Sequence, residues 1–256
     1  MILEFLTVPF INAIVWLYGL IGENFGMAIV LFTLAIRLLT FPLTSKQLKS
    51  TQAMQELQQS KKWQQIQKKH KNNREKLSQE QMKLYQEMGV SPFSSCLPTI
   101  LQMLIIFPVF FTVRRVLAST PLELLQLSRD LNLPDVSSLI PLNSQFLWMD
   151  LSQPERLFLD ILPGFGIPVL AIIVVITTFF QSKLMTPATT TSDQPSPTAG
   201  LTYMMPLMMG WISYIYSAGL ALYFLTGNIV SIAQFAATGR LKLSNLLPGN
   251  KKNLKT

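Results

Sequence analysis

The chain contains one cysteine, Cys96, and one histidine, His70, among its 256 residues. A single cysteine cannot form an internal disulfide, and His70 lies in a lysine-rich stretch without cysteine or carboxylate partners at ligand spacing. The sequence also lacks a glycine-rich phosphate loop, an HExxH motif and a pair of aspartates within an apolar segment. We therefore expect no structural disulfide, no metal site, no cofactor and no enzymatic activity.

Charged residues are scarce, at 13% of the chain, whereas hydrophobic residues make up 49% and the mean hydropathy is +0.35. This composition is not that of an ordinary soluble domain. The hydrocarbon core of a bilayer is roughly 30 Å thick and needs about 20 mostly apolar residues per helical span. Several segments meet this requirement, so the sequence predicts an all-α polytopic membrane protein with five transmembrane helices.

The predicted order along the chain starts with an interfacial helix at residues 1–22, for which a signal-like span is the alternative. A break near His70 divides residues 46–90 into two antiparallel helices. These either bury a narrow apolar stripe against each other or against lipid headgroups, or form a solvated hairpin without a partner. The remaining predicted segments are transmembrane helices at 25–45, 93–117, 161–182, 201–216 and 220–238, an extracytoplasmic loop at 118–160, a cytoplasmic loop at 183–200 and a basic cytoplasmic tail at 239–256.

The net charge of +8 is strongly segregated along the chain. Residues 46–90 carry ten Lys or Arg against four Asp or Glu, the tail from Arg240 carries five basic residues and no acid, and residues 114–160 carry four against six. Short positive segments belong in the cytoplasm. The distribution thus predicts a bacterial cell-membrane protein with its N-terminus outside and its C-terminus in the cytoplasm, rather than a sequence-specific nucleic-acid binder.

Arg37 is a charged residue inside the first predicted span, where its placement costs about 2.5–3.5 kcal/mol. Because it lies toward the cytoplasmic half of the span, snorkelling to the headgroups is one interpretation. The other is functional: the predicted spans contain no acidic residue that could neutralise it, so we expect water beside the guanidinium. We predict a hydrophilic groove that is open to the cytoplasm, with walls that include Gln102, Thr178, Gln181, Asn228 and Gln234.

A methionine cluster lies in the fourth predicted span. Such clusters usually face lipid or pack between helices, but unbranched thioethers also adapt to many partner side chains. The functional interpretation is an apolar slide formed by Met204, Met205, Met208, Met209 and Phe224. Because the sequence shows no energy-coupling site, we expect the protein to work passively.

Four segments of the chain resemble, in order, the signatures of the YidC-type insertases: TLAIRLLTFPLTSKQLKSTQAMQELQ, KLYQEMGVSPFSSCLPTILQM, FLWMDLSQP and AGLALYFLTGNIVSIAQ. The resemblance runs from about residue 19 to 240 and is to the compact form of the family. It implies an insertase and chaperone for nascent membrane proteins, with Arg37 as the positive residue of the groove. It also implies that residues 46–88, residues 181–200 and the C-terminal tail meet ribosomes, signal-recognition components or the Sec translocon.

Two other functions stay open from the sequence. A small anion transporter or channel could use Arg37 to bind its substrate, although inverted repeats or matching broken helices, which would favour a transporter, are not evident. An assembly chaperone that binds already inserted helices is the second, because members of the family both insert and assist folding.

Overall fold

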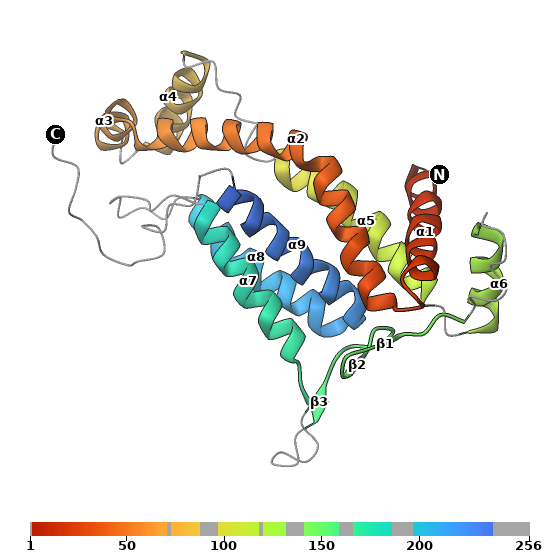
Figure 1. Ribbon diagram of the computed structural model, residues 1–256. Coiled ribbons are helices and arrows are strands. Elements are labelled where there is room, and N and C mark those ends of the chain that lie inside the picture. Colours follow the sequence, from red (N-terminus) through yellow and green to blue (C-terminus); the bar gives the residue numbers. More distant parts are fainter. Residues whose placement is uncertain are drawn as a thin grey trace. The chain divides into compact units, whose positions relative to one another are not determined.

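The computed structural model describes residues 2–70, 73–87, 97–117, 120–131, 141–158, 166–185 and 197–237. Within these residues the chain is mostly helical, which confirms the helical part of the predicted fold class (Figure 1). Cys96, the predicted tail and most of the predicted loop at 183–200 lie outside them. The helices are α1 (Ile2–Leu20), α2 (Phe25–Gln59), α3 (Lys61–Lys69), α4 (Arg74–Glu87), α5 (Leu97–Val116), α6 (Pro121–Asp130), α7 (Val169–Met185), α8 (Pro197–Ile215) and α9 (Ala218–Ala237).

The chain divides into two compact units. The bundle unit holds the described residues within Met1–Leu38, Ile106–Thr186 and Gln194–Thr256, and the hairpin unit holds those within Leu39–Ile105. Both α2 and α5 contribute one part to each unit.

Helix α2 runs without interruption through Pro42, across the predicted border between the first span and the cytoplasmic hairpin at residue 45. A proline inside a helix removes one backbone hydrogen bond and crowds the preceding turn. Here this cost does not end the helix, which continues to Gln59, and the next helix starts only after Ser60. The predicted hairpin therefore consists of the last part of α2 together with α3 and α4.

Two stretches of the described residues are long and apolar enough to cross a membrane, Phe25–Gln47 and Ala218–Ala237. The shorter apolar helices are Leu6–Leu20, Val169–Leu184 and Met204–Ile215. At 1.5 Å per residue, a helix of 20 residues spans about 30 Å, the thickness of the hydrocarbon core. Two stretches of the described residues pass this test of length and composition, so the number of five transmembrane spans remains a prediction.

Helix α9 is the most buried element of the bundle unit and packs against both α7 and α8. Small residues allow close approach between α7 and α8 as well. A Cβ atom on Gly210 of α8 would overlap Cγ2 of Val175 on α7, so α8 and α7 meet closely at this point. Glycine at a helix contact is typical of membrane bundles, where packing rather than the hydrophobic effect holds helices together.

Polar contacts tie α1 and α6 into the bundle unit. The Asn12 amide of α1 donates to the backbone carbonyl of Asp130 at the end of α6 (2.9 Å), and Arg115 of α5 forms an ion pair with the Asp130 carboxylate (2.9 Å). Helix α6 starts with a capping box, in which Thr120 and Glu123 each accept a hydrogen bond from the other's backbone N–H.

The predicted extracytoplasmic loop contains short β-structure, which was not predicted from the sequence. Strand β1 (Gln145–Phe146) pairs antiparallel with β2 (Met149–Asp150), and β3 (Leu157–Phe158) pairs antiparallel with β4 (Gly166–Ile167). Strands of two residues are too short for an alternating pattern to be read in the sequence.

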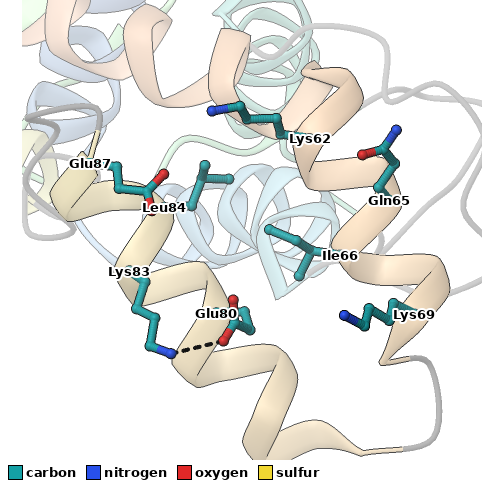
Figure 2. Close-up of a pocket in the computed structure, with 8 residues that line it drawn as sticks. All are labelled: Lys62, Gln65, Ile66, Lys69, Glu80, Lys83, Leu84 and Glu87. Carbon is teal, nitrogen blue, oxygen red and sulfur yellow. Dashed lines mark hydrogen bonds and ion pairs between the residues drawn. The ribbon is translucent and has the colours of Figure 1, made fainter.

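In the hairpin unit, the end of α2, α3 and α4 share a small core formed by Leu57, Trp63, Leu84 and Tyr85. The hydroxyl of Ser60 caps α3 by accepting from the Trp63 N–H (3.2 Å). A cavity of about 280 Å³ lies between α3 and α4. Figure 2 shows the apolar and charged side chains that line it. Its lining comprises Lys62, Gln65, Ile66, Lys69, Glu80, Lys83, Leu84 and Glu87.

Candidate substrate site around Arg37

Arg37 is half-buried in the bundle unit and lies against α9. A Cβ atom built on Gly227 would be 2.8 Å from Nη2 of Arg37 and 3.5 Å from both its Cζ and Nε. The guanidinium therefore occupies the space that a side chain at position 227 would fill. Seven residues further along α9, about two turns, the Gln234 amide donates to the backbone carbonyl of Arg37 (3.2 Å).

Tyr223 also lies near Arg37, close enough for an electrostatic interaction, and it is one turn before Gly227 on α9. The structure thus brings together Arg37, Tyr223, Gly227 and Gln234. Of these, Arg37 and Gln234 were predicted from the sequence. Gly227 and Tyr223 were missed. Tyr223 is four residues before Gly227 and Gln234 is seven residues after it, so the sequence already placed the three on one helix face.

Asn228 and Thr178, both predicted groove residues, are buried and face each other across the α7–α9 contact. The Asn228 amide donates to the hydroxyls of Thr178 (2.8 Å) and Thr177 (3.1 Å). The Thr177 hydroxyl in turn donates to backbone carbonyls one turn earlier. Within the described residues, Asn228 and Thr178 thus form a polar link between α9 and α7.

The other two predicted groove residues lie elsewhere. Gln181 is half-buried on α7, three residues after Thr178 and therefore on nearly the same helix face. Gln102 is half-buried on the first part of α5, which belongs to the hairpin unit.

The residues of the predicted slide do not share one surface. Met204 is 70% exposed and Met208 is also exposed, whereas Met209 and Phe224 are buried and Met205 is half-buried. The exposed methionines continue instead into Leu207 and Trp211, which the sequence analysis did not include. These four residues follow the i, i+3, i+4, i+7 spacing of one helix face.

A second polar cluster lies in the loop that precedes α7. The buried carboxylate of Glu155 accepts from the backbone N–H of Leu170 in the first turn of α7 (3.0 Å) and from the indole N–H of Trp148 (3.2 Å). A carboxylate at a helix N-terminus is favoured by the free N–H groups and by the helix dipole.

Nearby, Asp150 accepts hydrogen bonds from the backbone N–H (2.9 Å) and hydroxyl (2.7 Å) of Ser152. Partial burial raises the pKa of Asp150, but these bonds and one from Ser144 outweigh it and hold the pKa below its ordinary value. No group of three or more His, Cys, Asp or Glu side chains within the described residues could hold a metal ion.

The described residues form a helical protein with two stretches long enough to cross a membrane and an arginine held against the second of them. Residues 16–244 match the family model described as "60Kd inner membrane protein". The chain belongs to this family, which confirms the resemblance stated from the sequence motifs.

Curated relatives with similar sequences are named as membrane protein insertases. The chain is 36% identical over 238 residues to the membrane protein insertase YidC of Oceanobacillus iheyensis, covering 88% of this chain and 80% of that protein. It is 35% identical over 233 residues to the membrane protein insertase YidC 2 of Bacillus anthracis, covering 90% and 78%. These names do not favour an anion transporter.

A solved structure described as an active YidC insertase with the first transmembrane domain resolved is similar to this chain, with a TM-score of 0.53 and 26% identity. The match covers 85% of this chain and 42% of that one. The chain thus spans less than half the length of this structural relative.

Proposed function

We propose that this chain inserts membrane proteins into a bacterial cell membrane and assists their folding, without an energy source of its own. The relatives named as insertases support this activity. The observation that carries the mechanism is the position of Arg37, a half-buried cation held against Gly227 within an apolar helix.

The proposed placement in the membrane has five spans, with the N-terminus outside and the helical hairpin at residues 46–90 in the cytoplasm. Two of these spans are the long apolar stretches of α2 and α9. The bundle unit supports the placement because its helices expose large apolar side chains that water would not favour. Examples are Leu34, Phe107, Ile172, Ile176, Phe180, Leu207, Trp211 and Ile229.

We propose that Arg37 attracts the acidic or polar part of a substrate into a hydrated groove. A bare ion pair at 4 Å is worth about 4 kcal/mol at an effective dielectric constant of 20. Such attraction would trap a substrate, so water must screen it for the substrate to leave. Gln234 supports this role by bonding to the Arg37 backbone, and Gln102 and Gln181 are further proposed wall residues.

The proposed apolar slide is narrower than the methionine cluster. It consists of Met204 and Met208 together with Leu207 and Trp211, which are exposed on one face of α8. Flexible thioethers between larger apolar groups suit substrate helices of varied sequence. Met205, Met209 and Phe224 then serve mainly in packing.

Ribosomes, signal-recognition components and the Sec translocon are proposed partners of residues 46–88, residues 181–200 and the C-terminal tail. The cavity between α3 and α4 supports a contact role, because it exposes three lysines beside two glutamates (Figure 2). These lysines are Lys62, Lys69 and Lys83.

The function is tested with the purified chain as the only protein in liposomes. Single-span substrates with a short acidic tail or a matched uncharged tail are added, and protease protection measures their insertion. We expect more insertion than in empty liposomes, and equality between the two would reject insertase activity by this chain alone.

Variants of Arg37 then test the mechanism. We expect Arg37→Lys to retain most insertion, because charge and hydration matter more than guanidinium geometry, whereas Arg37→Ala and Arg37→Glu lose it. The loss should be larger for the acidic tail than for the uncharged tail. Full insertion of acidic tails by Arg37→Ala would leave only a packing or snorkelling role for this residue.

A further inference from the structure

The turn between β1 and β2 consists of two large apolar residues, Leu147 and Trp148. Leu147 is 73% exposed and has a φ of 54°, and Trp148 is 54% exposed. Positive φ in a two-residue hairpin turn is normally supplied by Gly, Asn or Asp, because a larger side chain is strained there. Leu147 therefore combines a backbone conformation that disfavours a bulky side chain with an exposed position where an apolar side chain is unfavourable in water.

This hairpin and the residues that follow it contact the starts of three helices (Figure 1). The Phe146 ring packs directly on Gly26, the second residue of α2. The N–H of Gly219, the second residue of α9, donates to the Leu151 carbonyl (3.0 Å), and Leu170, the second residue of α7, donates to Glu155. The hairpin is thus fixed at one level, where three helices of the bundle unit begin.

That level coincides with one edge of the hydrocarbon layer if α2 and α9 cross the membrane as proposed. The two apolar stretches begin at Phe25 and Ala218, one residue before the two glycines that touch the hairpin. A Leu-Trp turn at this height meets lipid headgroups and the upper acyl chains, where tryptophan is enriched.

We infer that Leu147 and Trp148 insert into the headgroup–acyl boundary of the bilayer and anchor the loop to it. The indole N–H already has an acceptor in Glu155, so the ring can enter an apolar layer without an unsatisfied donor. The inference rests on the proposed membrane placement of α2 and α9, but not on which side of the membrane the loop lies.

Tryptophan fluorescence tests the contact. The full chain, with Trp16, Trp63 and Trp211 replaced by Phe, is reconstituted in liposomes whose lipids are brominated either high or low on the acyl chain. We expect strong quenching of Trp148, greater with bromine near the headgroup, and weak quenching by aqueous iodide. Efficient quenching by iodide but not by brominated lipid would overturn the inference.

Two single-tryptophan controls separate this result from failure of the membrane placement. Trp211, exposed on α8, should be quenched by brominated lipid, whereas Trp63, buried in the hairpin unit, should not. An unquenched Trp211 would refute the placement itself. A quenched Trp211 with an unquenched Trp148 would refute only the anchor and leave the turn free for a protein partner.

A substitution at Leu147 provides a second measurement, in which loss of the lipid contact can be told apart from misfolding. Leu147→Asn relieves the strain, because asparagine tolerates positive φ, and at the same time removes the apolar side chain. Thermal stability in detergent should be retained, while quenching of Trp148 by brominated lipid falls and quenching by iodide rises. Unchanged quenching with retained stability would show that Leu147 has no part in the anchor.

Discussion

The contact between Arg37 and Gly227 allows the charge to be moved without being removed. A methyl group at position 227 would lie 2.8 Å from Nη2, whereas ordinary contact begins at 3.4 Å. In Gly227→Ala the guanidinium therefore has to shift by about 0.6 Å. This shift costs the fold little, because the displaced atoms are the end of a flexible side chain.

The expected effect on substrates follows from Coulomb's law. For a carboxylate first held at about 4 Å with an effective dielectric constant of 20, a shift of about 0.6 Å removes about 0.5 kcal/mol, or about two- to threefold. In Gly227→Leu the guanidinium leaves the α9 surface, and a separation of about 6 Å removes about 1.4 kcal/mol, or about tenfold. Insertion of acidic-tailed substrates should therefore fall in the order Gly, Ala, Leu.

The assay is protease-protected insertion in liposomes, expressed as the ratio of acidic-tailed to uncharged substrate. Gly219→Ala is a matched control on the same helix, because its Cβ would meet Val113, Ile29 and the Leu151 carbonyl but not Arg37. That variant should lose thermal stability and keep the substrate ratio. A wild-type ratio in Gly227→Leu would refute the idea that α9 positions the cation.

Three further predictions concern other parts of the chain. Asn228→Leu should lower the free energy of unfolding in detergent by about 1 kcal/mol, because two interhelical hydrogen bonds of about 0.6 kcal/mol each are lost, as thermal melting can measure. Because the pKa of Asp150 is lowered in the folded state, its stabilisation is present above its ordinary pKa of 3.8 and is lost below it; acid titration of the wild type should thus show a steeper decline below that pH than Asp150→Asn. In a Cys96→Ser background, impermeant maleimide should label Asp135→Cys in intact cells but not His70→Cys or Asp193→Cys, and labelling of the last two would contradict the five-span topology.

The sequence was sufficient to find Arg37, because a charge in an apolar run is conspicuous. It was not sufficient to find the place of Arg37 against Gly227, because a contact between helices nearly 200 residues apart leaves no local pattern. The same reason explains the slide: most faces of an apolar helix look alike in sequence, so the burial of Met209 and Phe224 was not predictable. Their exposure depends on which helices pack around them.

Other features could have been read more closely. Thr120 and Glu123 have the spacing of a capping box, with Pro121 at the first helical position, and this pattern predicts α6 inside a loop treated as irregular. The continuation of α2 past Pro42 was harder to foresee, because proline usually marks a helix end. The carboxylate of Glu155 was counted only as a negative charge outside, since its helix partner becomes adjacent only after folding.

The start of α9 also bears on how the protein assembles itself. The N–H groups of Ala218 and Gly219 donate to the carbonyls of Gln153 and Leu151, which are synthesised more than 60 residues earlier. During translation the loop is therefore complete long before its partners exist. Its two carbonyls stay without these partners until the last pair of helices, α8 and α9, has been made. Docking of that pair closes the bundle in a late, long-range step, so chains halted before residue 218 should persist as incompletely assembled intermediates, exposed to quality-control proteases.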